Sequence, residues 1–204
     1  MERDESLLTA WKEGDRRAGN RLFERHFERI RRFFVNKTSG DDEVSELTQR
    51  TFLRCVDASE RFEGRSSFRT FLFAIARNVL LEHYRQRLRD RRCNDFGDLS
   101  LVDLGAGPST LLHEKQEQQI LLLALRKIPM KDQVILELYY WEKLTAIQIG
   151  EIMEIPENTA RSRIRLGKQR LKEAIEGVTS EPGLAERTSE GLDRWAEEIR
   201  AGFG

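Results

Sequence analysis

The sequence contains little cysteine, histidine or proline, and it has no long apolar run. Its two cysteines, Cys55 and Cys93, lie far apart without a CxxC pair, and its three histidines share no ligand spacing. These absences argue against a disulfide framework, a zinc site and any bound cofactor. No stretch approaches the roughly 18 apolar residues that a membrane span needs, and the first residues are not the basic start of a signal peptide. We therefore expect a cytoplasmic protein that does not insert into a membrane.

Sequence motifs typical of enzymes are also missing. The chain has no GxxxxGK[ST] phosphate-binding loop, no GxSxG nucleophile elbow and no HExxH metal site. The stretch GAGPST at 105–110 is rich in glycine, but it contains no lysine that could bind a phosphate. The sequence therefore predicts that the protein is not an enzyme.

The charges of the chain cancel overall but are unevenly distributed. There are 35 basic and 35 acidic residues, so the formal net charge is zero. Residues 61–92 nevertheless hold nine arginines against three acidic residues, and residues 161–172 hold six basic residues and no acidic one. Residues 173–204 are acidic. Two basic segments and an acidic tail fit a polyanion-binding protein of neutral pI, although a run of charge is also typical of a solvated helix face.

Apolar residues recur at helical spacing along most of the chain, whereas alternating runs typical of strands are nearly absent. The pattern predicts an all-α protein with two small helical domains. Residues 1–92 are expected to form a four-helix bundle, and residues 113–176 a second domain. Residues 93–112, rich in Gly, Asp and Ser, predict a flexible linker. Residues 177–204 are expected to form an acidic C-terminal extension with a short amphipathic helix.

The second domain is expected to contain a helix-turn-helix. Residues 144–175 predict a short helix, a tight connection and a longer helix that opens at Pro156. At about 100° per residue, one stripe of the longer helix is small and apolar, with Ala160, Ile164, Gly167, Leu171 and Ile175. A neighbouring stripe is basic, with Arg161, Arg165, Lys168 and Lys172. Arginine can bind guanine edges and backbone phosphates, so this helix is a candidate DNA reader; a basic solvated helix is the alternative.

The last helix of the first domain combines cations with aromatic rings. The stretch RFEGRSSFRTFLFAIARNVL, residues 61–80, places a Gly-containing loop and a Ser66-Ser67 N-cap before this helix. Cations follow a phosphate backbone, aromatic faces stack on unpaired bases, and Ser or Asn can hydrogen-bond an extruded base. The apolar stripe is expected to be core, with Phe68, Phe71, Leu72, Ile75 and Val79. The residues predicted to bind single-stranded DNA are Arg65, Ser66, Phe73, Arg77 and Asn78.

Three stretches together resemble the extracytoplasmic-function sigma factors of the sigma-70 family. They are ELTQRTFLRCVDASERF, FEGRSSFRTFLFAIARNVLLEHYRQ and LTAIQIGEIMEIPENTARSRIRLGKQRLKEAI, and they occur in the order found in that family. The resemblance implies a sigma region 2 in residues 1–92 and a sigma region 4 in residues 113–176. It further implies a factor without catalytic activity that binds core RNA polymerase and directs promoter-specific transcription initiation.

The resemblance also implies which residues make the contacts. The first domain is expected to capture and help open the minus-10 element of promoter DNA with the five residues named above, and the second to read the minus-35 element. The residues that match minus-35 contacts are Arg161, Ser162, Arg163, Arg165 and Lys168. The residues that match the contact with core polymerase are Glu46, Leu47, Gln49 and Phe52. An anti-sigma factor is a further partner that the resemblance admits.

A free-standing helix-turn-helix transcriptional regulator is the alternative interpretation. Such a protein would bind duplex operator DNA by itself, usually as a dimer, and its first domain would sense a ligand or dimerise. A sigma factor instead needs core polymerase for useful promoter binding, so the two interpretations differ in what each protein requires.

Overall fold

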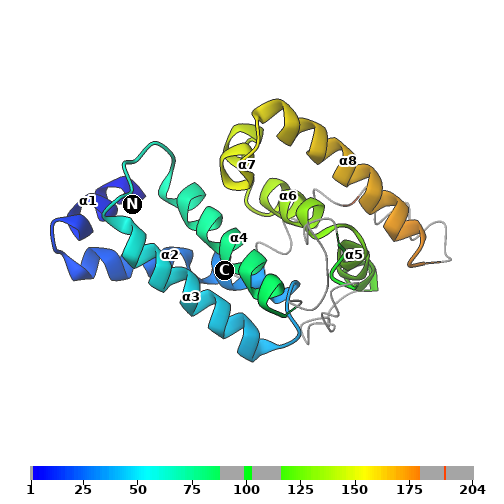
Figure 1. The fold of residues 1–204 in the computed structure, drawn as a ribbon, viewed down its shortest axis with the longest axis horizontal. Helices are drawn as coiled ribbons and strands as arrows, with labels where there is room; N and C mark the ends of the chain where they lie inside the picture. Colours follow the sequence, from blue (N-terminus) through cyan, green and yellow to red (C-terminus); the bar gives the residue numbers. More distant parts are fainter. Residues whose placement is uncertain (1, 88–98, 103–115, 180–190, 192–204) are drawn as a thin grey trace.

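The computed structural model describes residues 2–87, 99–102, 116–179 and 191. Within these residues it contains eight α-helices and no strand, which confirms the prediction of an all-α protein. Figure 1 shows the helices in two groups, with α1–α4 on one side and α5–α8 on the other. No helix among the described residues is long and apolar enough to cross a membrane.

The first group is the predicted four-helix unit. Its helices are α1 (Asp4–Lys12), α2 (Arg16–Val35), α3 (Asp41–Ser59) and α4 (Phe68–Arg87). The predicted N-cap of the last helix is present, because the hydroxyl of Ser67 accepts a hydrogen bond from the backbone N–H of Thr70 at 3.1 Å. This bond satisfies one of the backbone donors that a helix start leaves unpaired.

Helix α4 supplies much of the core of the first group. Phe68, Leu72 and Val79 are buried as predicted, whereas Phe71 and Ile75 are only partly buried at the edge of the core. Each fully buried large apolar side chain contributes about 1.5–3 kcal/mol to folding. The stripe therefore fixes which face of α4 turns inward and which positions remain at the surface.

The second group contains the predicted helix-turn-helix. Its helices are α5 (Gln116–Lys127), α6 (Met130–Tyr140), α7 (Ala146–Met153) and α8 (Glu157–Glu176). Thr145 and Gln148 form a reciprocal capping box at the start of α7, and Glu154 ends that helix in the left-handed conformation with φ 56°. The predicted apolar stripe of α8 is buried along its whole length, with Ala160, Ile164, Gly167, Leu171 and Ile175.

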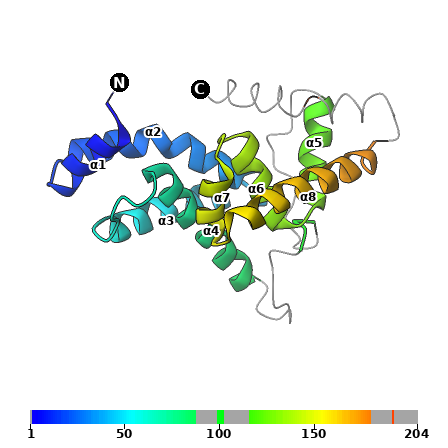
Figure 2. The same cartoon turned by 90° about the horizontal axis from the view of Figure 1, so that it is seen from above.

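The two groups of helices pack against each other. Helix α7 lies against α4, as both views show (Figures 1 and 2). One cluster of buried apolar residues runs from the first group into α6, α7 and α8. The sequence did not predict this contact. We refer below to residues 2–87 as the first half and to residues 116–179 as the second half.

The part of the predicted linker that the structure describes, residues 99–102, also packs on the second half. The carbonyl of Leu99 accepts a hydrogen bond from the N–H of Met130 at 2.9 Å, and the side chain of Leu101 is fully buried. The rest of the linker and most of the acidic extension lie outside the described residues.

Candidate nucleic-acid interface

The exposed side of α8 presents three of the five predicted minus-35 residues. Arg161, Ser162 and Arg165 are exposed, opposite the buried stripe of the helix. The guanidinium of Arg161 donates to the carboxylate of Glu157 one turn earlier, at 2.5 and 2.9 Å. Because this ion pair is exposed, it costs little to exchange it for a contact with a base. This face can therefore enter a groove of duplex DNA.

The other two predicted minus-35 residues are less accessible. Arg163 is half-buried. The ammonium of Lys168 lies over the rings of Tyr139 and Tyr140, 4.3 and 4.9 Å from their centroids. Cation–π contacts of this kind hold a lysine against its own protein. Lys168 therefore supports the packing of α8 on α6 in this conformation.

The loop before α4 carries two predicted minus-10 residues on the surface. Gly64 adopts φ 72°, a left-handed conformation that suits glycine, and the neighbouring Arg65 side chain is 86% exposed. Ser66 is half-buried. The loop is anchored at its base, because the ring of Phe62 stacks on that of Phe71 with centroids 4.4 Å apart. Arg65 thus projects into solvent from a loop whose base is held in place by this ring contact.

The structure places the remaining minus-10 residues in three different environments. Phe73 is only 1% exposed and packs edge-on against Phe33 with ring centroids 5.8 Å apart, so the expectation that it stacks on a base does not hold in this conformation. Asn78 is exposed. The Arg77 guanidinium donates to the side-chain oxygen of Asn78 at 3.2 Å and to Glu154 of the second half at 3.3 Å. The packed second half therefore occupies part of this surface.

The helix α3 presents a mixed polar and apolar face where the polymerase contact is expected. Glu46 and Gln49 are exposed, and Phe52 is partly buried. Leu47 was predicted to contact core polymerase, but its side chain is fully buried. It is therefore a core residue of α3 and not a surface contact. The reason is its position on the inward side of the helix, where its neighbours are other core residues.

Sequence reasoning missed the most exposed apolar residues of this region. Leu53 is 59% exposed, Val56 44% and Phe27 of α2 45%, and the Phe27 ring stacks on that of Phe52 with centroids 6.0 Å apart. We call these four residues the α3 apolar patch. Helical spacing could have revealed it, because positions 46, 49, 53 and 56 share one side of a helix. A group of exposed apolar residues marks a surface that binds a protein partner.

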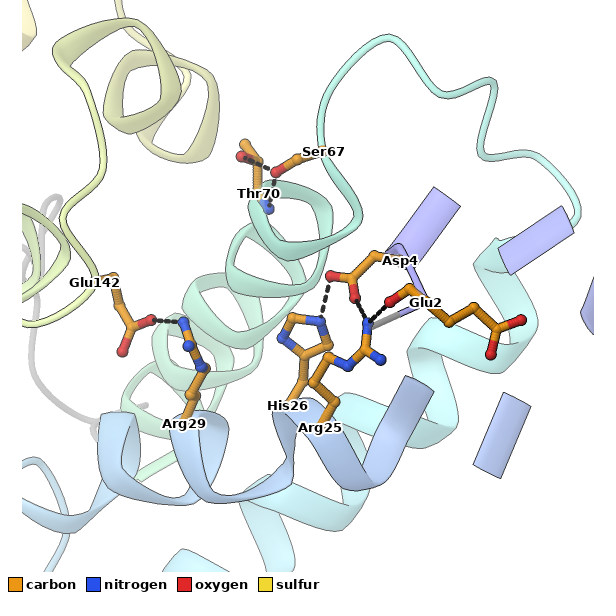
Figure 3. Close-up of polar contacts among 8 residues, drawn as sticks. All are labelled: Glu2, Asp4, Arg25, His26, Arg29, Ser67, Thr70 and Glu142. Atoms are coloured by element: carbon orange, nitrogen blue, oxygen red, sulfur yellow. Dashed lines mark hydrogen bonds and ion pairs between the residues drawn. The ribbon is translucent and has the colours of Figure 1, made fainter. Parts of the chain in front are cut away.

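Charged residues from the two halves meet where the halves pack. Glu142, in the connection between α6 and α7, accepts from Arg29 at 3.2 Å and from Arg32 at 2.8 Å. Figure 3 shows Glu142 reaching towards Arg29 on α2. Lys37 is completely buried and forms an ion pair with Glu137 of α6. Burial lowers the pKa of Lys37, although the nearby Glu137 carboxylate opposes this shift.

The polar group at the start of the chain has a structural role. Asp4 of α1 accepts from Arg25 at 2.6 Å and lies 2.7 Å from the Nε2 atom of His26, which ties α1 to α2 (Figure 3). Burial alone would raise the pKa of Asp4, but the hydrogen bonds with Arg25 and His26 lower it below its ordinary value. Among the described residues, no group of three or more His, Cys, Asp and Glu side chains could hold a metal ion.

Comparison with known proteins identifies both halves. Residues 22–90 match the family model described as Sigma-70 region 2, and residues 118–171 match that described as Sigma-70, region 4. The RNA polymerase sigma-H factor of Pseudomonas aeruginosa is 25% identical over 190 residues, which cover 89% of this chain and 98% of that protein. The ECF RNA polymerase sigma factor SigW of Bacillus subtilis is 23% identical over 176 residues, covering 80% and 92%.

Two solved structures share the fold. The sigma factor RpoE of Bartonella quintana, solved with the anti-sigma factor NepR, matches with a TM-score of 0.62 and 19% identity, over 77% of this chain and 96% of that chain. CnrH, solved with the cytosolic domain of CnrY, matches with a TM-score of 0.64 and 17% identity, over 86% and 99%. These two similarities support the arrangement of the helices.

Proposed function

Because this chain belongs to the extracytoplasmic-function branch of the sigma-70 family, it is a promoter-specificity subunit of RNA polymerase, and we propose how its halves divide that task. The observation that carries the proposal is the presence, in one chain and in order, of a region 2 bundle and a region 4 helix-turn-helix. The chain binds core RNA polymerase and directs promoter-specific initiation of transcription. Sigma factors are not enzymes, and we assign no catalytic residue.

Exposure and charge support the assignment of contacts within each half. We assign the minus-10 element to Arg65, Ser66, Arg77 and Asn78, and the minus-35 element to Arg161, Ser162 and Arg165 of α8. We assign core polymerase to Glu46, Gln49 and the α3 apolar patch. Because its proposed partners are core polymerase and promoter DNA, we propose that the chain acts in the cytoplasm. An anti-sigma factor is a further proposed partner, supported by the neighbour of similar fold that was solved with one.

A reconstitution tests the function directly. The purified chain is mixed with core RNA polymerase and duplex DNA that carries a candidate promoter, and run-off transcription and strand opening are measured. Transcripts are expected only when chain and polymerase are both present. Tight binding of the chain alone to the duplex, with no polymerase-dependent transcript, would instead support a free-standing regulator.

Replacing Arg161 by alanine is expected to weaken binding of the polymerase complex to the promoter by about 1–3 kcal/mol, which is typical of losing a bidentate contact with a base. The loss should depend on the minus-35 sequence, because the contact reads a base and not only a phosphate. Gln169→Ala, exposed on the same helix, is the matched control. An equal loss on promoters with and without a minus-35 element would contradict the assignment.

Replacing Asn78 by alanine is expected to impair strand opening while leaving polymerase binding intact. A hydrogen bond from its side chain to an extruded base contributes about 0.5–1.5 kcal/mol. Fluorescence of a base analogue in the minus-10 element reports opening, and co-elution reports polymerase binding. Gln86→Ala, also exposed on α4, should leave opening unchanged. Normal opening by the Asn78 variant would remove this residue from the minus-10 surface.

A further inference from the structure

The surface between the two halves is complementary in charge. The first half contributes arginines of α2 and α4 and Lys37, which follows α2. The second half contributes glutamates from α6, from the connection between α6 and α7, and from the C-cap of α7. The ion pairs across it are Arg29–Glu142, Arg32–Glu142, Lys37–Glu137 and Arg77–Glu154. Thus every ion pair that we describe between the halves has its cation on the first half and its carboxylate on the second.

Glu142 lies at the centre of a cluster of three arginines. Its side chain is 5% exposed, and each of its two oxygens accepts from a different guanidinium, Arg29 or Arg32. Arg69 of α4 lies within electrostatic range of this group: burial lowers the pKa of Arg69 and the positive charge of Arg29 adds to that shift, while the negative charges of Glu142 and Asp4 oppose it. We call Arg29, Arg32 and Arg69 the arginine cluster.

An arginine cluster of this kind suits a phosphate as well as a carboxylate. Guanidinium groups bind both anions through parallel N–H donors, and a phosphate offers more oxygens and more negative charge than a carboxylate. Bringing three arginines together without an anion is unfavourable, because like charges repel and partial burial removes their hydration. In the packed chain, where the side chains of Arg32 and Glu142 are only 15% and 5% exposed, Glu142 supplies that anion.

The position of the cluster points to the kind of anion. Arg69 and Arg77 lie about two helical turns apart on α4, and both interact with glutamates of the second half, Glu142 and Glu154. The surface that the second half covers therefore runs from the arginine cluster to Arg77, whose guanidinium also donates to Asn78. Single-stranded DNA binds along grooves in which cations follow its backbone next to groups that recognise bases. A strand held at Asn78 can thus continue towards the arginine cluster.

We propose that the arginine cluster binds backbone phosphates of the separated promoter strand and that Glu142 occupies this site when the two halves pack together. This inference rests on the proposed function, because it extends the minus-10 surface. The packed chain is then a closed form in which the second half competes with DNA for the first. The second half must move away from the first before DNA binds. The apparent affinity for DNA is therefore the affinity of the open form multiplied by the fraction of chains that are open.

Binding of a fluorescein-labelled oligodeoxythymidine to the isolated full-length chain tests the proposal by fluorescence anisotropy at low salt. Glu142→Gln keeps the size of the side chain but removes the competing charge, and it should tighten binding about tenfold if closure is the main barrier. Glu173→Gln makes the same change of net charge on the exposed side of α8, and it should leave binding within about twofold of the native chain.

A second substitution identifies the site. Arg32→Ala in the Glu142→Gln chain should abolish the gain and reduce the slope of log affinity against log salt by about 0.7, the value for one phosphate of a single strand. Arg31→Ala in the same background is the matched control, since Arg31 pairs with Glu28 on its own helix at 3.9 Å. This control should retain the gain.

Two results would overturn the proposal: equal affinities for Glu142→Gln and Glu173→Gln, or a gain that Arg32→Ala does not reverse. If the Glu142→Gln chain loses its helical circular dichroism, Glu142→Asp is tested in its place. Its shorter carboxylate should weaken closure and give a smaller gain in affinity for the oligonucleotide. An unchanged affinity of the Glu142→Asp chain would count against the proposal. The assay contains no polymerase. Failure of the reconstitution would therefore refute the proposed function, whereas failure here with normal transcription would refute this inference alone.

Discussion

Replacing Glu137 by glutamine is expected to destabilise the packed arrangement of the two halves by about 3–5 kcal/mol, the usual cost of removing one partner from a buried ion pair. Lys37 is fully buried, and its ammonium donates both to Glu137 and to the carbonyl of Phe33, the latter at 2.5 Å. Without the carboxylate, the charge of Lys37 is left in a site that water does not reach. Native-state hydrogen exchange at the end of α2 and along α6 measures the loss.

The loss should depend on pH in a defined direction. Burial lowers the pKa of Lys37 below its ordinary value of 10.5, and the Glu137 carboxylate opposes this shift, so the substitution should lower that pKa further. A lysine with a lowered pKa binds fewer protons in the packed form than in the open form, so packing gains stability as pH rises towards 10.5. The variant should therefore recover much of its loss in alkaline solution.

A double substitution separates the buried charge from the loss of packing. Lys37→Met added to Glu137→Gln removes the unpaired ammonium, so the double variant should be more stable than Glu137→Gln alone. Glu173→Gln, on the exposed side of α8, should change stability by less than about 0.5 kcal/mol. A loss that is independent of pH and unrelieved by Lys37→Met would show that the buried charge is not its cause.

The elements predicted with most success were those whose pattern depends on one helix alone. The buried stripe of α8 has the spacing of a helix with one apolar side, and the other side is strongly basic. The N-cap at Ser67 is equally local, because a hydroxyl three residues before a backbone N–H needs no distant partner. Such features are determined by neighbours in the sequence.

The surface residues were harder to predict where a helix has apolar residues on several sides. Phe73 follows Phe71 and Leu72, and spacing alone does not decide which of these three side chains lies in the core. The same ambiguity affects Leu47 and Leu53 on α3, of which the first is buried and the second exposed. The inward side of each helix is determined by the helices that pack on it.

The contact between the halves could not be predicted from sequence patterns at all. Lys37 and Glu137 are 100 residues apart, and each is an ordinary charged residue in its own segment. The packing of the two halves, in which α7 lies against α4, brings Lys37 next to Glu137 of α6. Where the halves meet, cations of the first half are therefore paired with glutamates of the second.

Replacing Leu53 by aspartate is expected to weaken binding to core RNA polymerase by about 2–4 kcal/mol, the range of an interface hot spot. Leu53 is the most exposed residue of the α3 apolar patch at 59%, and Glu46 and Gln49 lie on the same side of the helix. A charge placed at the centre of such a patch would have to be buried against the partner without a counter-charge. Fluorescence titration of labelled chain with core polymerase measures the affinity.

The fold itself should tolerate this substitution, because an exposed side chain contributes little to the core. Ile147→Asp makes the same change at a residue of α7 that is 54% exposed, and it should leave polymerase binding within about 0.5 kcal/mol of the native chain. Equal losses for the two variants would mean that any added acidic residue repels the polymerase. A loss confined to Leu53 would instead place the polymerase on α3, on the side of the first half that the second half leaves uncovered, so that the closed chain could bind polymerase before it opens to DNA.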